Sequence, residues 1–234
     1  MKLLLTSNGL SNKLIADAFV KLVGKNPKDI KVAFIPTAAL TEPDSKNWLI
    51  DDMYRIKELG CDVDIVDLAQ LTKKEWQERI KPCDVIFVGG GSTFYLSYWM
   101  QKSGFFEALP ELLKTKVYAG ISAGSIIVGQ TMRVTTEALE GIGILTDDEY
   151  ENLGPKGRSS SKTFGFVDFN LRPHLNSKQN HKVRNERFIT KIAKAMDKPL
   201  YAFDDASAIQ VVNGEVEAIS EGRWLKLDPE TGNT

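Results

Sequence analysis

The chain has 234 residues, 42% of them hydrophobic and 26% charged, a size and composition that predict one globular domain over residues 1–234. Its 30 basic and 31 acidic residues leave a net charge of −1, so no bulk field favours a nucleic acid or a membrane surface. Cys61 and Cys83 lie far apart and have no metal-ligand spacing, which suits a reducing compartment. The leucine-rich start is too short for a signal peptide, and we therefore expect a cytoplasmic protein.

Apolar strand-like runs alternate with amphipathic helix-like runs through the first half of the chain. The predicted elements are strands at 2–6, 31–35, 62–67, 85–88 and 117–119, and helices at 12–23, 48–59, 71–80, 93–102 and 105–114. Nearly continuous apolar strands in a βαβα order predict a mostly parallel sheet with helices on both faces, in a flavodoxin-like α/β fold.

The C-terminal part of the chain has a different pattern. Residues 200–203, 208–212 and 215–219 resemble strands, and Asn213-Gly214 is a strong hairpin turn between the last two. The simplest interpretation is an antiparallel extension at one edge of the sheet. A further apolar run at 164–169 is interpreted as a strand that Pro173 ends.

Ser122 stands in the pattern Gly120-x-Ser122-x-Gly124, between an apolar strand and a stretch suited to a helix. This is what a nucleophile elbow needs, because small residues two positions either side allow a sharp turn that exposes the serine hydroxyl. The alternative is a tight strand-to-helix turn with an incidental serine. We predict that Ser122 is a catalytic nucleophile.

Three consecutive glycines, ending at Gly91, follow the predicted strand at 85–88. Ligands of open α/β sheets bind beyond the carboxyl ends of the strands, so this turn and Ser122 are expected at the same edge. Backbone amides near Gly91 and at Ala123 are therefore candidates for an oxyanion hole. A glycine turn needed only for packing is the alternative.

A serine nucleophile needs a base, and the chain has two histidines. His174 follows Pro173 at the end of a predicted strand, whereas His181 lies in a highly charged stretch and is expected to be solvated. We therefore predict His174 as the base. The acid that would orient it is Glu137 or Asp205, and the residue pattern leaves both open.

Several of these segments together resemble the dipeptidase E and cyanophycinase family of serine peptidases, and most closely its aspartyl dipeptidase branch. The segments are MKLLLTSNG at 1–9, GGGSTF at 89–94, GISAG at 120–124, TMRVTTE at 131–137 and RPH at 172–174. The resemblance implies a fold similar to class I glutamine amidotransferases, with Ser122 as nucleophile, His174 as base, and an acid at Glu137 or Asp205. It implies no cofactor and no metal, and a small peptide as the binding partner of a monomer or homodimer.

The hypothesis is therefore a serine peptidase acting on dipeptides with an N-terminal acidic residue. Arg133, eleven residues after Ser122, is the candidate for pairing with a substrate carboxylate, and a surface salt bridge is its alternative role. A cyanophycinase-like enzyme, another peptide or ester hydrolase, and a non-catalytic binding protein on the same fold are the competing hypotheses. An α/β-hydrolase esterase fits less well, because that fold brings its histidine near the C-terminus.

Overall fold

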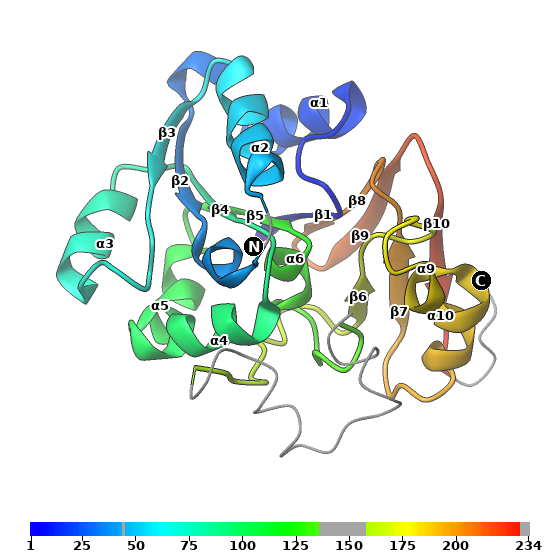
Figure 1. Ribbon diagram of the computed structural model, residues 1–234. Coiled ribbons are helices and arrows are strands. Elements are labelled where there is room, and N and C mark those ends of the chain that lie inside the picture. Colours follow the sequence, from blue (N-terminus) through cyan, green and yellow to red (C-terminus); the bar gives the residue numbers. More distant parts are fainter. Residues whose placement is uncertain (44, 136–157, 230–234) are drawn as a thin grey trace.

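The computed structural model describes residues 1–43, 45–135 and 158–229 (Figure 1). In chain order its elements are β1 (Lys2–Thr6), α1 (Lys13–Val23), the 3-10 helix η1 (Pro27–Asp29), β2 (Lys31–Ile35), the 3-10 helix η2 (Thr37–Thr41), α2 (Asn47–Glu58), β3 (Asp62–Ile65), α3 (Lys73–Ile80), β4 (Val85–Val88), α4 (Thr93–Lys102), α5 (Phe105–Leu112), β5 (Val117–Ile121), α6 (Ala123–Ile126), β6 (Asn170–Arg172), α9 (His181–Arg184), α10 (Glu186–Ala193), β7 (Leu200–Phe203), β8 (Ser207–Val212), β9 (Glu215–Ser220) and β10 (Trp224–Leu227).

A seven-stranded sheet with the order β3-β2-β4-β5-β1-β8-β9 forms the centre of the fold. Its first five strands run parallel, whereas β8 is antiparallel to β1 and β9 is antiparallel to β8. Leu4 of β1 lies between Ala119 of β5 and Gln210 of β8, so β1 joins the parallel and antiparallel parts. This confirms the predicted α/β class and its C-terminal hairpin.

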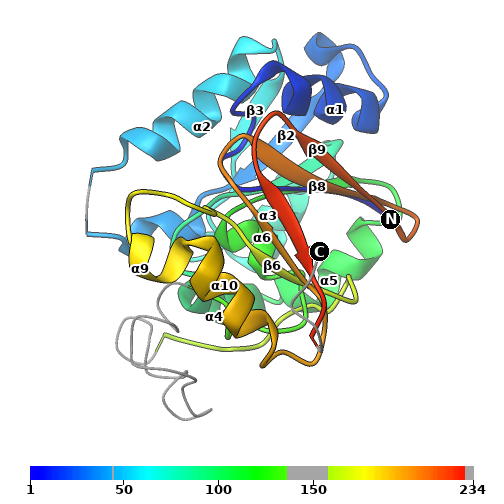
Figure 2. The same ribbon diagram turned by 90° about the vertical axis from the view of Figure 1, so that its right-hand side faces the viewer.

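A second sheet of three strands has the order β10-β7-β6, with β6 parallel to β7 and β10 antiparallel to β7. The predicted edge extension is therefore only partly right, because β7 leaves the large sheet and pairs with strands of its own. Strand β10 was not predicted. Figure 2 shows α10 lying over this small sheet, where Ile189 and Ala193 pack with Leu200 and Leu225.

The strand predicted at 164–169 is wrong. Its backbone follows residues 127–129, with the Phe164 and Phe166 amides donating to carbonyls of that segment. The two phenylalanine rings stack, and Phe164 also stacks on Phe106 of α5, with ring centroids 4.1 Å apart. The apolar run therefore reflects packing against a helix, and the strand itself comes later, at β6.

Helices cover both faces of the large sheet, with α1 and α2 on one side and α3, α4, α5 and α6 on the other (Figure 1). Their ends carry the expected caps: Thr72 and Glu75 form a capping box at α3, and Gly24 closes α1 at a φ of 76°. In the parts of the chain that the structure describes, no helix is long and apolar enough to span a bilayer.

Candidate active site

The turn between β5 and α6 holds Ser122 at φ 48° and ψ −104°, a backbone conformation that L-residues rarely adopt. Its two glycines are sterically required. A β-carbon at Gly120 would lie 2.5 Å from the carbonyl oxygen of Gly124, and one at Gly124 would lie 2.2 Å from the carbonyl oxygen of Val88. The glycine pattern of the sequence thus corresponds to a sharp strand-to-helix turn with Ser122 at its apex.

Buried hydroxyl groups hold this turn by hydrogen bonds to backbone carbonyls. Ser125 Oγ donates to the carbonyls of Thr6 and Gly120, at 2.8 and 2.9 Å. Tyr118 donates from its phenol to the Gly124 carbonyl at 2.6 Å, and burial raises the pKa of that phenol, which keeps the donor protonated. The position of Ser122 is therefore set by the core of the large sheet.

His174 reaches Ser122 from the small sheet. Strand β6 ends at Arg172, Pro173 follows, and His174 turns back at a φ of 62°. Its Nε2 lies 3.0 Å from Ser122 Oγ, and its Nδ1 lies 2.6 Å from Asp205 Oδ1. Because β6 and β7 are parallel neighbours, their carboxyl ends bring His174 and Asp205 to the same edge.

Two adjacent acids after β7 have separate positions. Asp204 accepts hydrogen bonds from the Ala206 and Arg223 amides and from the Ser207 hydroxyl, so it organises the turn. Asp205 instead faces His174. The turn is therefore stabilised by Asp204, and it is Asp205 that contacts the histidine.

Ser7 is a site residue that the sequence reasoning missed. Its hydroxyl donates to Asp205 Oδ1 at 2.6 Å and accepts from the His174 backbone amide at 2.8 Å. It follows β1, which lies next to β5 in the sheet. A polar Ser7-Asn8-Gly9 break directly after an apolar strand was the available signal.

Opposing effects set the pKa of the Asp205 carboxyl. Partial burial tends to raise it, but hydrogen bonds from His174 and Ser7 and the positive charge of Arg184 outweigh burial, so the pKa lies below its usual value. An ionised Asp205 accepts the Nδ1 hydrogen of His174. The Nε2 atom is then the acceptor for the Ser122 hydroxyl.

The triple-glycine turn lies beside the serine. A β-carbon at Gly90 would be 3.3 Å from Ser122 Cβ, and Gly91 has a φ of 126° at a place where a β-carbon would meet the Ala38 carbonyl oxygen at 2.2 Å. Ala123 is the first residue of α6, where helix amides have no partner within the helix. The glycine turn thus lies against Ser122 through Gly90, and Ala123 follows Ser122 directly; an oxyanion hole formed by amides near Gly91 and at Ala123 stays a prediction.

These groups line a cleft of about 600 Å³ between the two sheets. Its lining residues include two acids, Glu42 and Asp52, and two arginines, Arg172 and Arg184. The other lining residues are Ser7, Asn8, Trp48, Gly90, Gly91, Thr93, Ile121, Ser122, Ile126, Pro173, His174, Ser177, Gln179, Asn180 and Asp205. The cleft therefore offers both signs of charge close to a serine hydroxyl.

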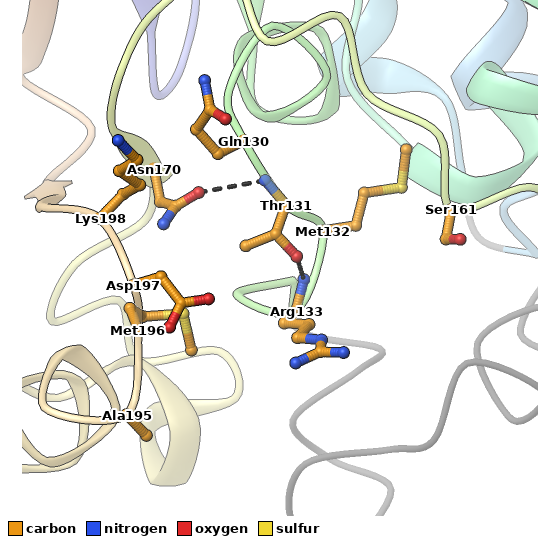
Figure 3. Close-up of a pocket in the computed structure, with 10 residues that line it drawn as sticks. All are labelled: Gln130, Thr131, Met132, Arg133, Ser161, Asn170, Ala195, Met196, Asp197 and Lys198. Carbon is orange, nitrogen blue, oxygen red and sulfur yellow. Dashed lines mark hydrogen bonds between the residues drawn. The ribbon is translucent and has the colours of Figure 1, made fainter.

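Arg133 lies elsewhere, along a separate cavity of about 420 Å³ whose lining includes neither Ser122 nor His174. Figure 3 shows it beside Thr131, across from Asp197, with its backbone amide bonded to Thr131 Oγ1 at 3.1 Å. Glu137, the other candidate acid, lies outside the described residues. Within residues 1–43, 45–135 and 158–229, no three histidine, cysteine or acidic side chains group to hold a metal ion.

The comparisons with known proteins all lead to peptidases. A model of peptidase family S51 matches residues 3–219. The chain is 26% identical to an uncharacterized peptidase of Pasteurella multocida, PM1590, over 88% of this chain and 91% of that protein. It is 24% identical to Peptidase E of Streptomyces coelicolor, over 90% and 81%. A crystal structure of a Listeria monocytogenes protein provisionally assigned to peptidase E has the same fold, with a TM-score of 0.72 at 21% identity and coverages of 94% and 98%.

Proposed function

The chain belongs to peptidase family S51, a family of serine-type peptidases, and we propose that it hydrolyses dipeptides with an acidic N-terminal residue. The observation that carries the proposal is the hydrogen-bonded series from Ser122 through His174 to Asp205, set in one cleft. A serine, a histidine and a carboxylate in this order are the groups that acyl transfer requires. The same series supports Asp205 as the acid that orients His174, and Glu137 is the alternative for this role.

In the proposed mechanism, Ser122 Oγ attacks the peptide carbonyl carbon while His174 Nε2 takes its proton. Backbone amides near Gly91 and at Ala123 stabilise the resulting oxyanion, at about 3 kcal/mol per donor. His174 then protonates the leaving amine as the carbon–nitrogen bond breaks. Water attacks the acyl-enzyme with His174 again as base, and Ser122 regains its proton.

Selectivity for an acidic residue requires a cation near the acyl side of the scissile bond. Arg184 lines the cleft and lies close enough to Asp205 to lower its pKa, so it is positioned to pair with a substrate carboxylate. Arg133, the candidate from the sequence, would have to act from the neighbouring cavity. Arg184 is therefore our first candidate and Arg133 the second.

A panel of Asp-Leu, Glu-Leu, Ala-Leu, cyanophycin and p-nitrophenyl acetate tests the proposal. We expect the highest kcat/KM with Asp-Leu. Preferential release of dipeptides from cyanophycin would favour the cyanophycinase-like alternative, and ester cleavage alone would favour an esterase. Binding of peptides without any turnover would contradict catalysis and indicate a binding protein on this fold.

A further inference from the structure

A buried carboxylate, Asp52, lies in the cleft and has no role in the steps above. It lies one helical turn after Trp48 on α2, so the two residues share a helix face, and both line the cleft. Its side chain is 3% exposed. A carboxylate is rarely buried to this degree unless a cation or strong donors compensate it.

Short contacts place this helix face beside the reacting serine. Gly90 lies between the serine and Trp48: a β-carbon added to it would be 3.3 Å from Ser122 Cβ and 3.8 Å from a ring carbon of Trp48. A β-carbon at Gly9 would likewise be 3.0 Å from Asp52 Oδ1 and 3.2 Å from Ile121, the residue before the serine. Asp52 and the side chain of Ile121 therefore both lie next to Gly9.

The described residues compensate the Asp52 charge only weakly. Its ion-pair partner is Arg55, whose Nη1 lies 3.4 Å from Asp52 Oδ1 and makes a shorter bond, 3.0 Å, to the Asn8 carbonyl. Burial raises the pKa of Asp52 to about 7; Arg55 lowers it and Asp51 raises it further. Such a carboxylate gains a great deal from a second cation brought by a ligand.

We propose that Asp52 binds the α-ammonium group of the substrate and so restricts the enzyme to peptides with a free amino terminus. The inference rests on the proposed function and extends it. The cleft would then recognise a dipeptide by both charges of its first residue. Asp52 binds the ammonium group, and Arg184, another lining residue, binds the side-chain carboxylate. Asp52 suits the ammonium better than Glu42, because Glu42 is less buried and water screens its charge more.

The test compares Asp-Leu with N-acetyl-Asp-Leu. Wild-type protein should favour the free peptide in kcat/KM by about a hundredfold or more, and Asp52→Asn should lose that preference by failing on the free peptide alone. Asp51→Asn makes the same charge change at the preceding, exposed position of α2 and should keep the preference. Arg55→Met removes the cation but retains Asp52, and this variant should also keep the preference for the free peptide. If Arg55→Met and Asp52→Asn have the same effect, Asp52 merely positions Arg55, and the proposal is overturned.

A binding measurement separates this inference from the proposed function. Calorimetry with Ser122→Ala protein needs no turnover, and the free peptide should bind about a hundredfold more tightly than its acetylated form. Adding Asp52→Asn should remove the difference. Equal binding of the two peptides, or no binding of either, would overturn the ammonium site. Asp52-dependent binding without hydrolysis by the wild type would instead overturn the proposed function and leave the site in place.

Discussion

The two sheets contribute opposite halves of the candidate active site in different ways. The large sheet supplies Ser122 and the glycine turn, each fixed by contacts among residues adjacent in sequence or on neighbouring parallel strands. The small sheet supplies His174 and Asp205 at the ends of β6 and β7, which are only three and four residues long. The position of the nucleophile thus depends on contacts within one sheet, whereas the position of the base depends on how the small sheet meets the large one.

Removing the nucleophile should have the largest effect and leave both sheets intact. We expect Ser122→Ala to lower kcat on Asp-Leu by about a million-fold, as loss of a triad serine does in other proteases. Circular dichroism and the Tm should show a folded protein. Residual activity near the wild-type level in that folded variant would remove Ser122 from the mechanism.

The contribution of the small sheet is tested by its two adjacent acids. Asp205→Asn should lower kcat by about ten-thousandfold, because an amide no longer holds the Nδ1–H tautomer of His174. Asp204→Asn, the matched control, weakens three turn hydrogen bonds and should lower the Tm while changing kcat less than tenfold. Glu137→Gln should have a smaller effect than Asp205→Asn. The reverse ranking would transfer the orienting role to Glu137.

The difference between the sheets also explains what the sequence could predict. The parallel strands, the elbow at Ser122 and the Asn213-Gly214 hairpin have strong local signals, and they appear where expected. The small sheet has weak sequence signals. Its strand β6 is only three residues long, and the more apolar run before it, at 164–169, packs against α5. Ser7 has only a weak signal, the polar break after β1, because its partners lie 167 and 198 residues away in the sequence. Asp52 has none, because an acid on an amphipathic helix is normally exposed, and nothing in the sequence indicates that this one is buried.

Substrate choice should separate the arginine in the cleft from the one outside it. Arg184→Met should lower kcat/KM for Asp-Leu by about a hundredfold and change Ala-Leu little, since a charged partner in the cleft would be left unpaired. Arg133→Met should have a much smaller effect on the same ratio. A larger effect at Arg133 would restore the original assignment, and equal losses on both substrates would indicate that the arginine supports folding.

The smallest expected effect is on stability, at Asp52. Folding raises the pKa of this carboxyl from 3.8 to about 7, so the folded state binds more protons than the unfolded state between these values. The stability that protonated Asp52 contributes is present below pH 4 and is lost as the pH rises through 7. Asp52→Asn should therefore raise the Tm at pH 8 by a few degrees and have little effect at pH 4. Thermal melts at both pH values, with Asp51→Asn as control, test this; a lower Tm at pH 8 would contradict it.

The backbone at Ser122 has a consequence for attempts to engineer this chain. A residue with a β-carbon at φ 48° and ψ −104° costs about 1–3 kcal/mol, which glycine would not incur. Selection for thermal tolerance alone would therefore favour glycine at position 122 and an uncharged residue at 52. Such a screen would converge on a sturdier protein with no nucleophile and no counter-charge for its ligand, so any library for this fold needs a functional readout beside the thermal one.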